Sequence, residues 1–307
     1  MYNMSVDLTK IKTESQNEAT KNIDLLDTID IISLINEEDK KVAFAVEKEK
    51  ERIAKLVDAV VGTFEKDGRL IYMGAGTSGR VGIIDAVECR PTFGVSDDMV
   101  MCLMAGGVNA FVKAVEGAED NKDLAKEDLI RVDLNANDLV IGIAASGRTP
   151  YVIGGINYAK EKGCLTGCIV TSPNSPLASL VDYPIEAIVG PEVITGSTRM
   201  KSGTAQKMIC NMITTTSMIK LGKVYGNLMI DVMPTNEKLR ARAVSILVKA
   251  TGVSEEEAKQ AILKYGNVKK ALFAILSGIS DVDRVNQLLD ANKGNIRKAL
   301  EGIRNNG

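Results

Sequence analysis

The sequence predicts an α/β protein in three layers, with a parallel sheet of five strands between two layers of helices. From Arg69 onward, short apolar segments of strand length alternate with longer amphipathic segments of helix length. Two of the apolar segments end in glycine- and hydroxyl-rich loops directly before a helix, which is typical of parallel sheets with helical crossovers. The 307 residues suffice for this core and a smaller appended region.

The expected elements of this core follow from the change of period along the chain. Strands are expected within residues 69–76, 99–107, 138–146, 164–172 and 183–190. Helices are expected over residues 78–89, 110–115, 124–131, 149–162, 176–181 and 202–221.

The regions on either side of the predicted sheet are helical. Before it, one long helix is expected over residues 36–66, with Asn36 as its cap and Gly68 at its end. We therefore predict three parts: an N-terminal helical segment that packs on the core (1–68), a ligand-binding α/β domain (69–236) and a small helical domain (237–307).

The last part contains an internal repeat. The element G-N-(V/I)-(K/R)-K-A-L begins at Gly266 and again at Gly294, a spacing of 28 residues. Ser254 with Glu257 forms the pattern of a capping box, and Ser280 begins a similar one. These signals predict two helix-turn-helix pairs without catalytic groups.

Composition excludes several classes of function. A net charge of −2 gives no general attraction to nucleic acid or to a membrane surface. The five cysteines form no C-x-x-C pair, the N-terminus is too charged for a signal peptide, and prolines interrupt the longest uncharged stretch. We therefore expect buried free thiols and a cytoplasmic protein.

Because the chain has no histidine, Ser-His triads, histidine-ligated zinc and imidazole acid/base catalysis are excluded.

The first glycine-rich loop, GAGTSGR at residues 74–80 (loop 1), matches the dinucleotide fingerprint G-x-G-x-x-G. A dinucleotide site also needs an acidic residue at the end of the next strand, but the segment 99–107 ends in two glycines. Loop 1 instead offers donors to an anion at the start of a helix. The candidate ligand-binding residues are Thr77, Ser78, Gly79 and Arg80. The alternative is a tight turn without a ligand.

The second loop, AASGRTP at residues 144–150 (loop 2), follows another strand and supplies Ser146, Gly147, Arg148 and Thr149. Loops at the ends of neighbouring parallel strands converge on one cleft, so both loops predict one anion site. Neither loop has the G-K-(S/T) ending of a Walker nucleotide site. A third segment, residues 190–207, either contacts the ligand or caps the helix that follows. Its candidate binding residues are Glu192, Ser197, Thr198 and Lys201.

At these segments the sequence resembles the N-acetylmuramic acid 6-phosphate etherases. The resemblance rests on GAGTSGR, AASGRTPYV and GPEVITGSTRMKSGTAQKM, and it extends to TESQNEATKNIDLL, DAVECRPTFGV and AVEGAEDN. It implies a sugar isomerase (SIS) domain, and the tail resembles a ubiquitin-associated (UBA) helical fold. Glu18 and Arg90 stand where the family usually has proline, and Ala144 replaces a serine common in the wider superfamily.

The resemblance implies cleavage of the D-lactyl ether of N-acetylmuramic acid 6-phosphate, which gives N-acetylglucosamine 6-phosphate and D-lactate during cell-wall recycling. It implies no metal and no organic cofactor, and a homodimer with its sites near the subunit interface. Two alternatives share the fold: a regulatory protein that senses sugar phosphates, and an aldose–ketose isomerase. The regulatory relatives resemble two such domains in tandem, whereas this chain has length for one.

The family match points to a pair of catalytic carboxylates, Glu88 and Glu119. An elimination reaction needs a base at carbon 2 and an acid for the departing oxygen, and a carboxylate pair can supply both. We assign Glu119 as the base and Glu88 as the acid, and the apolar neighbours of Glu88 predict its partial burial. The acids nearby in sequence that could replace them are Asp85, Glu116, Asp120 and Glu192.

Overall fold

The computed structural model describes residues 12–113, 115–232 and 236–305. The chain divides into two compact units. The first combines the residues up to Val87 with Asp98–Thr214, and the second combines Glu88–Asp97 with the residues from Thr215 onward. Each unit has an apolar core of its own. The domain boundaries at residues 68 and 236 stay predictions.

The first unit contains the predicted five-stranded parallel sheet. Its strands are β1 (Leu70–Gly74), β2 (Val100–Met104), β3 (Leu139–Ile143), β4 (Leu165–Val170) and β5 (Tyr183–Glu186). They lie in the order β2-β1-β3-β4-β5, and all neighbours are parallel. Strands β1 and β3 are buried along their whole length, which explains their continuous apolar sequences. The prediction of five parallel strands is confirmed.

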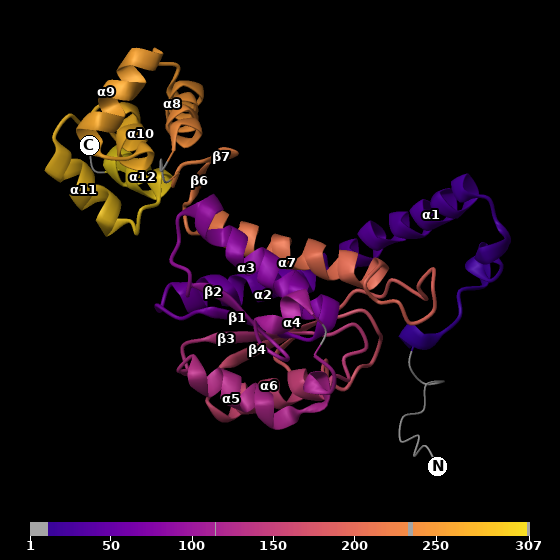
Figure 1. Cartoon of the computed structure of the whole chain (residues 1–307). Helices are drawn as coiled ribbons and strands as arrows, with labels where there is room; N and C mark the ends of the chain where they lie inside the picture. The colour runs from indigo at the N-terminus through magenta and orange to yellow at the C-terminus, as the bar shows by residue number, and fades with distance from the viewer. Residues whose placement is uncertain (1–11, 114, 233–235, 306–307) are drawn as a thin grey trace. The chain divides into compact units, whose positions relative to one another are not determined.

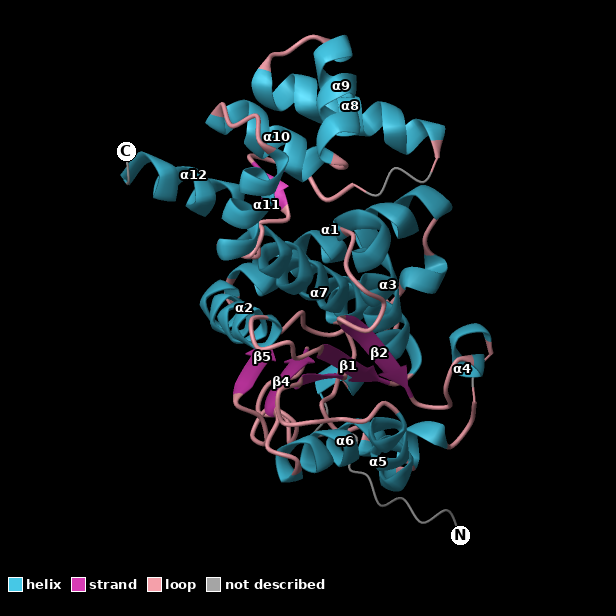
Figure 2. Ribbon diagram, turned by 90° about the vertical axis from the view of Figure 1, so that its left-hand side faces the viewer, coloured by secondary structure: helices cyan, strands magenta, loops and turns pink. Residues whose placement is uncertain are grey.

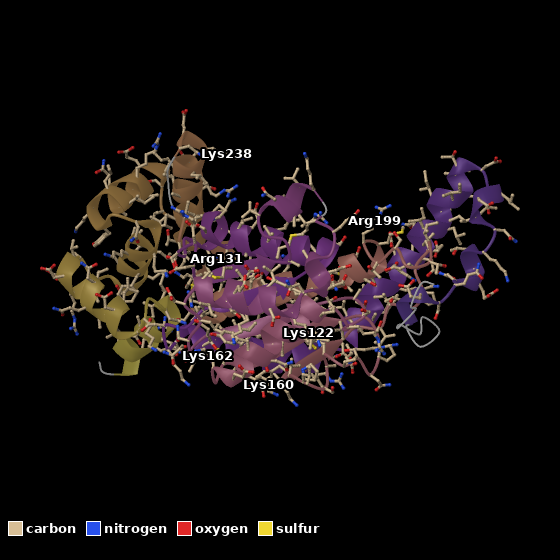
Figure 3. The ribbon with its side chains drawn as sticks, turned by 60° about the horizontal axis from the view of Figure 1, so that its bottom comes forward. Lys122, Arg131, Lys160, Lys162, Arg199 and Lys238 are labelled. Atoms are coloured by element: carbon tan, nitrogen blue, oxygen red, sulfur yellow. The ribbon has the colours of Figure 1, made fainter. Side chains whose placement is uncertain are left out.

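Helices cover both faces of this sheet (Figures 1 and 2). One face carries α5 (Lys122–Arg131) and α6 (Pro150–Glu161). The other carries α2 (Lys50–Phe64), α3 (Gly76–Phe93) and α7 (Lys201–Lys220). The outer side of α5 and α6 exposes Lys122, Arg131 and Lys160, which keep this surface solvated (Figure 3). The three-layer architecture is confirmed.

The single long helix expected over residues 36–66 is wrong. The chain forms α1 (Thr28–Glu47) and α2, and Asn36 lies inside α1 instead of capping a helix. The interruption lies at Glu49, whose carboxylate accepts hydrogen bonds from the Glu186 backbone amide at 3.2 Å and from Arg52 at 3.1 Å. Within residues 12–27, three short 3-10 helices precede α1: η2 (Lys12–Glu14), η3 (Glu18–Thr20) and η4 (Ile23–Leu25). Figure 1 shows α1 extending beyond the edge of the sheet.

The short helix expected over residues 176–181 is also wrong, because this segment forms turns. The Ser175 hydroxyl accepts a hydrogen bond from the Ala178 amide at 3.1 Å, and the Leu177 amide donates to the Gly147 carbonyl at 3.1 Å. These contacts satisfy amides that a helix would leave free at its start, and they attach the segment to loop 2. The helix expected over residues 110–115 is shorter, as α4 (Asn109–Val112).

The second unit contains, within the described residues, a hairpin, five complete helices and the last residues of α3 and α7. Its elements are β6 (Val224–Tyr225), β7 (Leu228–Met229), α8 (Glu237–Thr251), α9 (Glu255–Tyr265), α10 (Val268–Ser277), α11 (Val282–Ala291) and α12 (Ile296–Asn305). The capping box of Ser254 with Glu257 is confirmed. The one expected at Ser280 is wrong, because the Asp281 side chain caps α11 instead. The hairpin was missed, although Gly226 followed by asparagine is a two-residue hairpin signal.

The repeated element of the tail is a junction between helices. Gly266 ends α9 in the left-handed conformation, and the Asn267 side chain accepts from the Lys270 amide at 2.9 Å to start α10. In the second copy, Asn295 accepts from the Lys298 amide at 3.1 Å. Gly294 lies two residues after Asn292, the C-cap of α11, and its amide donates to the Leu289 carbonyl at 2.8 Å. In both copies the glycine therefore bonds to the end of the preceding helix and the asparagine caps the next, which explains why G-N recurs.

The cysteines are free, as predicted, and four of the five are buried while Cys102 is half-buried. In the part of the chain that the structure describes, no helix has the length and apolar character needed to cross a membrane. The prediction about a signal peptide falls largely on residues 1–11, which lie outside the described residues.

Candidate functional site

A pocket of about 340 Å³ lies in the first unit where loops 1 and 2 meet. It is lined by Thr13 and Glu14 of η2, by both loops, by part of η5 (Ala118–Asp120), and by Gly196 and Thr198 of the third segment. The loops follow β1 and β3, which are adjacent in the sheet, so the carboxyl ends of these strands bring them together. The predicted convergence of the two loops is confirmed.

Loop 1 turns sharply because its glycines allow two backbone segments to touch. A Cβ atom on Gly74 would lie 2.6 Å from the Gly79 nitrogen, so a larger residue at Gly74 would force β1 and α3 apart. Thr77 and Ser78 line the pocket. The Ser78 hydroxyl donates to Gln206 Oε1 at 2.9 Å, so this buried glutamine of α7 orients it.

The Arg80 side chain bonds to backbone carbonyls of α4. Its Nε donates to the Phe111 carbonyl at 2.9 Å and its Nη2 donates to the Ala110 carbonyl at 2.8 Å. Arg80 does not line the pocket between the loops. It lines a smaller pocket of about 230 Å³, to which Ala75, Gly76 and Glu119 also contribute.

Loop 2 presents the start of α6 to the pocket. Gly147 has φ = +64°, and a Cβ atom there would lie 2.4 Å from the Ser175 hydroxyl, so only glycine fits without rearrangement. Ser146, Arg148 and Thr149 line the pocket. Thr149 is the N-cap residue of α6 but makes no side-chain capping bond. The positive end of α6 and this hydroxyl therefore form the position best suited to an anion.

The third segment caps a helix, as one of the two alternatives predicted, and part of it also lines the pocket, whereas ligand contact stays a prediction. Glu192 is fully buried, and its two carboxylate oxygens accept from the Lys201 and Ser202 amides, each at 2.9 Å, at the start of α7. Glu192, Ser197 and Lys201 do not line the pocket, whereas Thr198 does. In this arrangement Glu192 acts by holding the segment in place.

Lys201 is buried in an ion pair that joins α7 to α1. Its Nζ lies 2.6 Å from Glu38 Oε2, and both side chains are almost fully buried. Burial by itself raises the pKa of Glu38, but its bonds with Lys201 and Lys41 outweigh this and hold that pKa below its ordinary value.

The predicted glutamates occupy different places. Glu119 is exposed on η5 and lines both pockets, with Asp120 in the larger one and Glu116 in the smaller. Glu88 lines neither of these pockets. It lies on α3, 12 residues after Gly76, which is about 18 Å along a helix axis. Glu88 is exposed, so its expected partial burial is wrong for the single chain.

Asp85, a possible substitute for Glu88, is engaged inside the fold. It is buried and accepts hydrogen bonds from Asn211 at 2.6 Å, Thr214 at 3.0 Å and Tyr72 at 3.1 Å. Burial raises its pKa although these donors oppose the shift. Asp85 therefore joins α3 to α7 and β1.

Three residues at the site are not among those predicted from the sequence. Thr13 and Glu14 line the larger pocket, and Gln206 orients Ser78. The available signal was indirect, because all three lie in segments that carry the family resemblance. The local sequence around Thr13 and Glu14 does not indicate that η2 lies beside loops 1 and 2.

Family models match most of the chain. Residues 52–160 match the N-terminal SIS domain of glucokinase regulatory protein, residues 115–216 match the SIS domain, and residues 226–289 match the C-terminal lid domain of glucokinase regulatory protein. The SIS match confirms the predicted domain type.

Individual proteins match over nearly the full length. The chain is 53% identical over 302 residues to an N-acetylmuramic acid 6-phosphate etherase of Clostridium beijerinckii, which covers 98% of this chain and 99% of that protein. It is 53% identical over 297 residues to the protein of the same name from Clostridioides difficile, covering 96% and 97%. A solved structure, a putative phosphosugar isomerase of Bacteroides fragilis, aligns at 22% identity and a TM-score of 0.49, covering 64% of this chain and 94% of that chain.

Proposed function

Because this chain belongs to the N-acetylmuramic acid 6-phosphate etherases, we propose that it cleaves the D-lactyl ether of N-acetylmuramic acid 6-phosphate. The products are N-acetylglucosamine 6-phosphate and D-lactate. The observation that carries the proposal is 53% identity over 98% of the chain to a protein of that name. The pocket between loops 1 and 2 fits the substrate because it combines an anion position with a carboxylate, Glu119.

The phosphate binds at the start of α6 in this proposal. Ser146 and Thr149 supply hydroxyls, Arg148 supplies a positive charge, and the helix supplies amide groups. Thr77 and Ser78 then face the sugar from loop 1, with Thr198 across the pocket. Glu192, Ser197 and Lys201 support this arrangement from outside the pocket lining.

The chemistry that suits a carboxylate pair is an elimination followed by addition of water. In the open-chain sugar, carbon 2 lies next to the aldehyde, so its proton is acidic enough for Glu119 to remove. The electrons of that bond form a double bond between carbons 2 and 3, the bond from carbon 3 to the lactyl oxygen breaks, and Glu88 gives that oxygen a proton. Glu88 then takes a proton from water, whose oxygen adds to carbon 3, and the protonated Glu119 returns a proton to carbon 2, so both carboxyl groups regain their starting states.

This mechanism requires Glu88 at the pocket, and Glu88 is not among the residues that line it. We propose that Glu88 reaches the pocket of a second subunit in a homodimer. Next to Glu88 on α3, Ile84 is 49% exposed and Val87 is 60% exposed, and such apolar patches mark protein interfaces. The exposed Ile29, Ile32 and Phe44 give α1 a second apolar face. The five free thiols are compatible with the cytoplasmic location that we propose.

Release of D-lactate from N-acetylmuramic acid 6-phosphate, followed with a coupled dehydrogenase, tests the reaction. The purified protein should release one D-lactate per N-acetylglucosamine 6-phosphate formed. A ketose phosphate as product would support the isomerase alternative. Binding of the substrate without release of lactate would support the sensor alternative, and either result would refute the proposal.

Substitution of the two glutamates tests their roles. Glu88→Gln and Glu119→Gln should each keep substrate binding and lower turnover by roughly 100-fold or more, because the proton transfers are lost. Near-normal turnover in either variant would remove that residue from the mechanism.

Mixing the two variants tests whether the residues come from different subunits. In a dimer that combines Glu88→Gln with Glu119→Gln, one site regains both glutamates only if each site draws them from two chains. A refolded equal mixture should then recover about a quarter of wild-type activity, since about half the dimers are mixed and each has one intact site. If the mixture stays as inactive as the parents, a shared site is refuted.

A further inference from the structure

The smaller pocket adjoins the larger pocket in the first unit, where the proposed function places the sugar. Its volume is about 230 Å³, and it shares Ala75, Gly76 and Glu119 with the larger pocket. Glu119 therefore lies at the boundary between the two pockets. A substituent on the sugar next to the carbon on which Glu119 acts would extend into the smaller one.

The remaining wall of this pocket is apolar apart from two charged residues. Its apolar side chains are Met104, Ala105, Ala110, Val115 and Ala118. Arg80 adds a guanidinium whose two hydrogen-bonded partners, the Phe111 and Ala110 carbonyls, hold it in place without neutralising its charge. Glu116 adds an exposed carboxylate. The apolar side chains can accommodate a methyl group. The Arg80 guanidinium can pair with a carboxylate on the same small group, because the carboxylates of Glu116 and Glu119 are exposed and screened by solvent.

We propose that the smaller pocket binds the D-lactyl group of the substrate, an inference that rests on the proposed function. The lactyl group is attached to carbon 3, next to the carbon 2 proton that Glu119 removes. Its methyl group contacts Ala110 and Val115, and its carboxylate pairs with Arg80. Arg80 thus recognises the leaving group, whereas the phosphate lies at the start of α6.

The acetamido group on carbon 2 competes for the same position, because it also lies near Glu119 and carries a methyl group. The two substituents differ in charge: the lactyl group is anionic and the acetamido group is neutral. A change of charge in the pocket wall therefore distinguishes them.

Val115 is the position for this change, because it lines the pocket and is 45% exposed, so a polar side chain there does not disrupt the core. Val115→Glu and Val115→Gln have nearly the same shape and differ by one charge. We expect KM for N-acetylmuramic acid 6-phosphate to be about tenfold higher with glutamate than with glutamine. Val115→Lys should give the lowest KM of the three variants.

The product N-acetylglucosamine 6-phosphate provides the control, because it keeps the acetamido group and lacks the lactyl group. Its inhibition constant should be the same for Val115→Glu and Val115→Gln. Equal KM values for this pair, with normal lactate release by the unmodified protein, would overturn the inference alone. Absence of lactate release by the unmodified protein would overturn the proposed function and this inference together. If a Val115 variant does not fold, Ala118→Glu and Ala118→Gln repeat the comparison on the same wall.

Discussion

Replacing Lys201 by methionine should destabilise the first unit strongly, because it leaves Glu38 buried without its main partner. The two side chains are 1% and 4% exposed, and Nζ lies 2.6 Å from the carboxylate. Breaking a buried ion pair costs about 3–5 kcal/mol. Lys41 still pairs with Glu38 from the surface, so we expect the lower end, about 3 kcal/mol. A loss of that size lowers Tm by about 6–12 °C in a unit of roughly 200 residues.

Urea unfolding followed by circular dichroism measures this loss. The matched control is the double variant Glu38→Leu with Lys201→Met, which removes both charges and should unfold within about 1 kcal/mol of the unmodified protein. If Lys201→Met alone unfolds within about 0.5 kcal/mol of the unmodified protein, the pair does not hold α1 and α7 together as argued.

The double variant also separates two roles for Lys201, which the sequence analysis placed among the residues that bind the sugar phosphate. If Lys201 only supports the fold, the double variant recovers both stability and KM. If Lys201 reaches the phosphate during the reaction, stability returns while KM stays high. The second result would refute the supporting role.

Two further predictions concern pH and helix capping. Asp138 is buried and paired with Arg69 at 2.7 Å, and although burial raises its pKa, the bonds with Arg69 hold that pKa below the ordinary value of 3.8. The native pKa lies below the unfolded one, so the stability from this pair is present above about pH 4 and is lost as pH falls through the native pKa. Asp138→Asn should therefore flatten the fall of the unfolding free energy between about pH 6 and 3, measured by urea unfolding. An unchanged slope would contradict this prediction. Ser254→Ala should lower the free energy of unfolding of the second unit by about 1 kcal/mol, measured by thermal unfolding. The control Ser280→Ala removes no cap and should lower it by no measurable amount. Equal losses would refute the capping assignment.

The local features of this protein follow from the sequence alone. The alternation of buried strands and amphipathic helices depends on side-chain periodicity, which acts within a few residues, so the sheet could be predicted. The turn at Gly74 and the capping box at Ser254 are equally local. The hairpin at Gly226 carried a local signal too, but its strands of two residues each are too short to show a period.

Long-range contacts decided what the sequence could not. Glu49 interrupts the N-terminal helix by bonding to β5, more than a hundred residues away in sequence, and the turns after Ser175 are attached to loop 2. The same kind of contact determines which polar residues face the pocket. Glu192 and Lys201 are charged residues of the kind that bind ligands. In the fold, however, Glu192 accepts from the backbone at the start of α7 and Lys201 pairs with Glu38. Periodicity predicted the strands and placed the two glycine-rich loops at one edge of the sheet. Only the packing of distant segments decided which candidate side chains line the pocket, because burial and pairing depend on neighbours far away in sequence.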